Sequence, residues 1–149
     1  MTASARRSGG RLYTPEILAL AVELAQYQLD DAESERGTAV SRVCGSRVVI
    51  GLDASPDGAI ERIGAQATAC AIGQAAAALF LRSAIGKRRE DIAHAASALE
   101  EWLSADGPIP PWPGLAVLTP ARAYPARHPA ILLPWKAALD ALSKSDSAG

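Results

Sequence analysis

The stretch RVCGSRVVIGLDASPDGAIERIGAQATACAIGQAAAA, residues 42–78, decides the fold of this chain. Residues 47–52 form an apolar run rich in β-branched side chains, and strand character resumes over residues 60–65. The intervening residues 53–58, with the sequence DASPDG, have the composition of a turn. The stretch therefore predicts an antiparallel hairpin, followed directly by an alanine-rich helix over residues 71–85.

Sequence N-terminal to this stretch predicts one helix and a third strand. Thr14-Pro15-Glu16 has the chemistry of a helix start, with a capping hydroxyl, a proline in the first turn and an acid facing the helix dipole. We expect this helix to end near Tyr27 or Leu29. Residues 38–41 are a further strand candidate, which gives a sheet of two to three strands.

Sequence C-terminal to the stretch is mostly helical. After Gly86, a plausible helix end, the apolar stripe Ile92, Ala96, Leu99, Trp102 and Leu103 predicts a second helix that stops at residues 106–108. Residues 108–120 read as a proline-rich connector. A final helix uses Leu132, Trp135, Leu139 and Leu142, and starts near Pro129 or Pro134.

The length of 149 residues suits one domain. We predict a flexible leader over residues 1–12, a single domain over 13–142 and a flexible tail over 143–149. The predicted class is α+β, a small antiparallel sheet packed against several helices.

Composition excludes several classes of function. The formal net charge is −1, which argues against binding to nucleic acid or to a membrane surface through bulk charge. No apolar run approaches the roughly 18 residues that a membrane span needs. Two cysteines are too few for a secreted disulfide scaffold, so a reducing cytoplasm is the expected location.

The two cysteines are the main candidates for chemistry. Cys44 precedes the first strand of the predicted hairpin and Cys70 follows the second, so both thiols can lie at the same end of the sheet. Cys70 also opens a helix, where the helix dipole favours a thiolate. An equally open interpretation is that both are buried core cysteines, since free cysteine is among the most buried residue types.

Histidines and other motifs add little by themselves. His94 reads as a helix-surface residue, whereas His128 would be a ligand only if its turn approaches the cysteines; otherwise it is a capping or surface residue. Neither a phosphate loop nor a nucleophile elbow occurs in the sequence. No acid–base or nucleophile set beyond the cysteines is visible, so we do not expect an enzyme.

Three motifs in order resemble one known family. They are Val-Cys-Gly-Ser at 43–46, Cys70 at the head of a buried helix, and Pro-Ala-Arg-His followed by Leu-Leu-Pro-Trp within 125–135. Together they look like the NifU/IscU/SufU iron–sulfur cluster assembly scaffolds, over residues 13 to about 142. The resemblance implies an IscU/SufE-like fold and a site that receives sulfur from a cysteine desulfurase. It also implies a transient [2Fe–2S] cluster or a zinc ion at that site, and apo iron–sulfur proteins as acceptors.

Carried over residue by residue, the family's first and second cysteines match Cys44 and Cys70. The family's aspartate falls at Ser46 and its third cysteine at Ala130, which are two departures. The resemblance then leaves Cys44, Cys70 and His128 as the ligand set, with Ser46 or water as a weaker fourth ligand. Cys44 and Cys70 are also the candidate persulfide acceptors.

Three functions remain open at this point. The first is an iron–sulfur scaffold or carrier that accepts sulfur and iron at its two cysteines. The second is a homologue without metal that binds a protein partner, for example to regulate a desulfurase. The third is a zinc-bound persulfide acceptor.

Overall fold

The computed structural model describes residues 12–105 and 107–148. Three antiparallel strands form one sheet in the order β1-β2-β3, with bounds Glu35–Val40, Arg47–Ala54 and Ile60–Thr68. The predicted hairpin is β2–β3, and the third strand is real, although it lies at 35–40 instead of 38–41. The predicted leader, residues 1–12, falls outside the described residues except for Leu12, which is buried in the core and so belongs to the domain.

The helices begin close to where their capping residues predict. Their bounds, with the 3-10 segments labelled η, are α2 Pro15–Glu23, η1 Leu24–Gln26, α3 Ala71–Ala84, α4 Arg89–Ser104, η2 Leu115–Ala123, η3 Pro125–Arg127 and α5 His128–Ala148. The Thr14 hydroxyl accepts a hydrogen bond from the N–H of Ile17 at 3.2 Å, which is the cap that the sequence predicts. The fold class is the α+β class expected.

Two predictions about the C-terminal part need correction. The connector at 108–120 is not irregular throughout, because η2 occupies its second half and continues to Ala123. Helix α5 continues to Ala148, into the range 143–149 that was predicted to be a flexible tail. Lys144 explains part of this extension: its Nζ donates to the Arg36 carbonyl at 2.9 Å and pairs with Asp140 at 3.4 Å.

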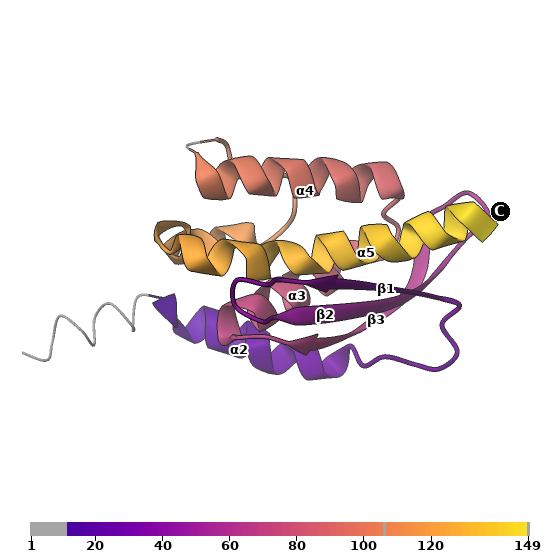
Figure 1. The fold of residues 1–149 in the computed structure, drawn as a ribbon, viewed down its shortest axis with the longest axis horizontal. Helices are drawn as coiled ribbons and strands as arrows, with labels where there is room; N and C mark the ends of the chain where they lie inside the picture. The colour runs from indigo at the N-terminus through magenta and orange to yellow at the C-terminus, as the bar shows by residue number, and fades with distance from the viewer. Residues whose placement is uncertain (1–11, 106, 149) are drawn as a thin grey trace, which may run out of the picture.

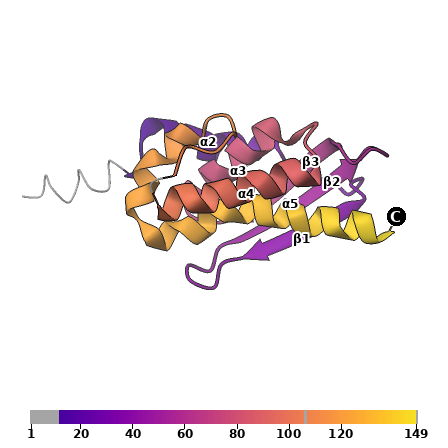
Figure 2. The ribbon, with the colours of Figure 1, turned by 90° about the horizontal axis from the view of Figure 1, so that it is seen from above.

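The helices cover one face of the sheet. Helix α5 runs along β1 and β2, α3 lies against β3 and α5, and the outer layers are α2 on α3 and α4 on α5 (Figures 1 and 2). Alternate strand residues Val48, Ile50 and Leu52 are fully buried toward these helices. The opposite face carries exposed residues such as Arg36, Thr38 and Arg62, so the hydrophobic core lies on the helical side.

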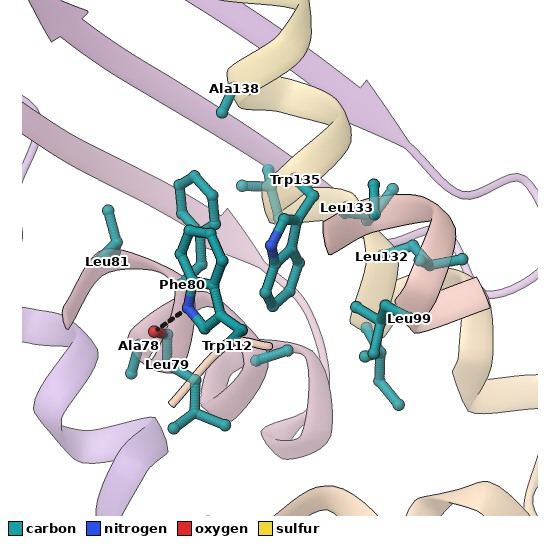
Figure 3. Close-up of a cluster of buried hydrophobic side chains, with 14 of the residues drawn as sticks. Ala78, Leu79, Phe80, Leu81, Leu99, Trp112, Leu132, Leu133, Trp135 and Ala138 are labelled. Atoms are coloured by element: carbon teal, nitrogen blue, oxygen red, sulfur yellow. Dashed lines mark hydrogen bonds between the residues drawn. The ribbon is translucent and has the colours of Figure 1, made fainter. Parts of the chain in front are cut away.

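An aromatic cluster fills the core between α3 and α5. Phe80 stacks on Trp112 with ring centroids 5.2 Å apart, and Trp135 meets both rings edge-on (Figure 3). The Trp112 indole N–H donates to the Leu79 carbonyl at 2.9 Å, which ties the proline-rich connector to α3. The connector is therefore anchored to α3 by Trp112.

Candidate functional site

Cys44 lies in the turn between β1 and β2. The N–H of Ser41 donates to the Ser46 carbonyl and the N–H of Gly45 donates to the Ser41 carbonyl, both at 2.8 Å. Gly45 has φ +72°, a left-handed conformation that glycine adopts without steric cost. This closed turn leaves Cys44 exposed at the edge of the sheet.

Two buried serine hydroxyls contact the Cys44 sulfur. Its Sγ lies 3.4 Å from Ser41 Oγ and 3.1 Å from Ser46 Oγ, and the two serines are only 5% and 4% exposed. These hydroxyls lower the pKa of the Cys44 thiol, Ser41 most and Ser46 next, against a smaller opposing effect of desolvation. The Ser46 backbone and the positive charge of Arg127 lower that pKa further. The turn is built to stabilise a thiolate.

Cys70 lies between the end of β3 and the first residue of α3. It is the N-cap residue of that helix, it is half-buried, and its carbonyl accepts the N–H of Gln74 at 2.9 Å. The Gln74 side-chain amide donates to the Ala69 carbonyl at 3.1 Å and so fixes the start of the helix. The helix-start position that the sequence predicts for this thiol is the one observed.

The two cysteines line one open hollow of about 280 Å³. Strand register explains their meeting, because Arg47 at the start of β2 pairs with Thr68 at the end of β3. Residues just before β2 and just after β3 therefore lie at the same end of the sheet. The complete lining is Cys44, Gly45, Ser46, Thr68, Ala69, Cys70 and Arg127.

Arg127 is the member of this site that the sequence reasoning did not single out. It comes from η3, more than fifty residues after Cys70, and its Nη2 donates to the Tyr13 hydroxyl at 3.5 Å. The guanidinium lines the hollow that holds both thiols. The sequence signal for Arg127 is the Pro-Ala-Arg-His motif, in which this arginine directly precedes His128.

His128 does not join the cysteines. Its Nε2 donates toward the carbonyls of Ala121 and Arg122, at 3.2 and 3.1 Å, so this nitrogen is occupied by η2. The side chain lines a separate hollow between α4 and α5, beside Leu103. The expected convergence of His128 with Cys44 and Cys70 is therefore not found. Across the described residues, no group of three or more His, Cys, Asp or Glu side chains is placed to hold a metal ion.

Ala130, which the resemblance aligns with the family's third cysteine, is completely buried. A Cβ added to Gly73 in α3 would lie 2.8 Å from the Ala69 Cβ and 3.3 Å from the Ala130 Cβ. Ala69 lines the hollow, whereas Ala130 is not part of its lining. Ser46, which the resemblance aligns with the family's aspartate, contributes a hydroxyl to Cys44 and not a carboxylate.

Comparisons with solved structures give the class of protein. The chain is similar to a nitrogen-fixing NifU-like protein (N-terminal) from Brucella abortus, with 28% identity and a TM-score of 0.84, covering 95% of this chain and 99% of that one. It is also similar in fold to a putative iron–sulfur cluster assembly scaffold protein for the SUF system from Fervidobacterium islandicum. That match has 21% identity and a TM-score of 0.72, and covers 89% and 98% of the two chains.

A third solved structure, a hypothetical protein, matches with 20% identity and a TM-score of 0.61 over 85% of this chain and 96% of that one. No family model and no curated protein matches the sequence. The resemblance that the three motifs indicate is supported by the similarity to the NifU-like structure, and the fold is shared with the SUF-system scaffold. None of the helices in residues 12–105 and 107–148 is long and apolar enough to cross a membrane.

Proposed function

We propose that this protein is a scaffold or carrier in iron–sulfur cluster assembly, which accepts sulfur and iron at Cys44 and Cys70. The observation that carries the proposal is the shared hollow, in which the two cysteines of the chain meet. Soft thiolates are the ligands that iron–sulfur clusters use. The relatives named as a NifU-like protein and a SUF scaffold support the same role.

Sulfur delivery fits the exposed position of Cys44. The Cys44 thiolate attacks the outer sulfur of a persulfide on a cysteine desulfurase, and a new S–S bond forms as the donor's S–S bond breaks. The donor cysteine leaves as a thiolate, the outer sulfur keeps its proton, and Cys44 carries the persulfide. The hydroxyls of Ser41 and Ser46 stabilise the attacking thiolate by hydrogen bonding. Apo iron–sulfur proteins are the proposed recipients.

The departures at Ser46 and Ala130 favour loose binding. A structural zinc site uses four protein ligands, and a catalytic zinc site uses three. Here two thiols face the hollow, with the Ser46 hydroxyl beside Cys44. Iron or zinc bound by these groups remains open to exchange, as a carrier requires. The same donor set also supports a second candidate, a persulfide acceptor that holds zinc and passes sulfur without assembling a cluster.

Metal and acid-labile sulfide content after anaerobic reconstitution tests the proposal. The unmodified chain is compared with Cys44→Ala, Cys70→Ala and, as a matched control outside the hollow, His128→Ala. We expect iron and sulfide in the unmodified chain, loss of both in each cysteine variant and no change in His128→Ala. Zinc without sulfide would favour the persulfide acceptor. No metal in any sample would favour the homologue that binds a partner, such as a desulfurase, without metal.

A further inference from the structure

A [2Fe–2S] cluster needs more thiolates than this hollow holds. Clusters of this type are usually held by four cysteine thiolates, two on each iron. The chain has two cysteines in total, and both line the same hollow. Ala130 is fully buried and brings no ligand atom, and His128 lines another hollow. One copy of the chain therefore supplies half of a cluster site.

We infer, on the basis of the proposed function, that a second copy of this chain supplies the other half. Cys44 and Cys70 of each copy would then bind one iron of a single [2Fe–2S] cluster on a twofold axis. A symmetric dimer presents the same surface twice, so the two thiols meet an identical pair across the axis. The cluster itself joins the two copies, which explains how a small contact surface can hold them together.

The rim of the hollow is suited to meeting a copy of itself. Cys44 is exposed, and so are two apolar side chains, Val43 next to it in the turn at 73% and Val40 at the end of β1 at 56%. These valines lie in β1 and in the turn that carries Cys44, on the edge from which a second copy would approach. Contact between the valines of two copies would remove apolar surface from water around the cluster.

Charge makes the association depend on the cluster. An oxidised [2Fe–2S] core held by four thiolates carries a net double negative charge. Each copy places the guanidinium of Arg127 at its hollow, so two copies offset that charge. Without the cluster, the same arginines repel each other, and exposed Arg42 and Arg47 add positive charge at this edge. The apo chain is therefore a monomer and the cluster-bound chain is a dimer.

Anaerobic native mass spectrometry of the reconstituted full chain tests this inference. Reconstitution uses a phosphine reductant, so that no small thiol from the buffer can act as a ligand, and equal parts of ¹⁵N-labelled and unlabelled chain. We expect apo chain at the monomer mass and one [2Fe–2S] cluster on species of two chains, with mixed-isotope dimers present. A cluster on a single chain would overturn the inference and leave the proposed function intact. No bound iron or sulfide in any species would overturn both.

One variant separates ligation from contact. Val43→Glu retains all ligands and places like charges opposite each other in the dimer, so the cluster-bound dimer should dissociate at least tenfold more readily than the unmodified one. Circular dichroism confirms that the variant is folded. A cluster-bound dimer that is unchanged in Val43→Glu would contradict the proposed contact surface.

Discussion

The sheet has two turns, residues 41–46 between β1 and β2 and residues 55–59 between β2 and β3. They share a pattern of backbone hydrogen bonds but differ in what their side chains contact. In each turn the first residue is a serine whose N–H donates to the carbonyl of the last residue, and a glycine with positive φ donates to the serine carbonyl. The equivalent residues are Ser41, Gly45 and Ser46 in one turn and Ser55, Gly58 and Ala59 in the other.

The side chains make the difference. In the 55–59 turn, the Ser55 hydroxyl donates to the Asp57 carboxylate, which also pairs with Arg88 of the α4 cap at 2.6 Å. These hydrogen bonds lower the pKa of Asp57 to about 2. In the 41–46 turn, hydroxyls face the Cys44 sulfur instead. The 55–59 turn ties the sheet to α4, and the 41–46 turn places a thiol with a lowered pKa at the hollow.

Replacing the central residue of each turn should give the largest contrast. Cys44→Ala removes one of the two thiols, so iron and sulfide loading should be abolished. Because Cys44 is exposed, its free energy of unfolding should change by no more than about 0.5 kcal/mol. Asp57→Asn should keep full loading and lose stability at neutral pH. Metal analysis and urea unfolding check both variants. Iron retained by Cys44→Ala would contradict the assignment of metal binding to the 41–46 turn.

Alanine at each turn glycine should have the next largest effect, on stability. Gly45 has φ +72° and Gly58 has φ +92°, and an added Cβ would meet nothing within 4 Å at either position. The loss should therefore reflect backbone strain alone, about 1 kcal/mol for each of Gly45→Ala and Gly58→Ala. Urea denaturation of both variants measures it. A much larger loss in one turn would show that its glycine has a second role.

Removing one hydroxyl near Cys44 should have a moderate effect on reactivity. Ser46→Ala deletes a hydrogen-bond donor to the thiolate, so the pKa of Cys44 should rise and less thiolate should be present at neutral pH. One such bond is worth about 1 kcal/mol, or about fivefold in alkylation rate. The rate of iodoacetamide labelling against pH, followed in a Cys70→Ala background, measures this. Ser55→Ala in the other turn is the matched control, and it should leave the rate unchanged.

The pH dependence of Asp57→Asn should be the smallest effect. The pKa of Asp57 is lower in the folded chain, about 2, than its ordinary value of 3.8, so the carboxylate stabilises the fold above about pH 4. That contribution disappears as pH falls toward 2. The stability difference between the unmodified chain and Asp57→Asn should therefore be present at pH 7 and shrink below pH 4. Thermal unfolding at a series of pH values tests this, and a constant difference would contradict it.

Local signals predicted most of the fold. The Thr14-Pro15 cap, the DASPDG turn and the stripe of α4 each correspond to an observed element, because caps, turns and periodic apolar faces depend on nearby residues. Predictions that depend on distant contacts were less accurate. Strand β1 contains Gly37, where a Cβ would overlap the α5 backbone at Ala137, so its place depends on a helix a hundred residues later.

The candidate site shows the same division. Hairpin topology alone brings the ends of β2 and β3 together, and this predicted that Cys44 and Cys70 share an edge. The prediction that His128 is a third ligand required its side chain to point toward the cysteines. That direction is set by two proline-containing 3-10 segments, η2 and η3, which precede it. Arg127 faces the hollow and the next residue, His128, faces the carbonyls of η2. The spacing of a motif does not predict which of two adjacent residues points into the site.

The contact between β1 and α5 also affects how the protein behaves at high concentration. The N–H of Thr38 donates to the Asp140 carboxylate at 3.0 Å, and the Arg36 carbonyl accepts from Lys144. On the opposite edge, the Ala65 N–H donates to the Tyr27 carbonyl at 2.7 Å. Side chains and a neighbouring segment thus occupy hydrogen-bonding groups that would otherwise recruit foreign strands. The sheet resists amyloid-like growth along its edges while the cysteine rim stays open.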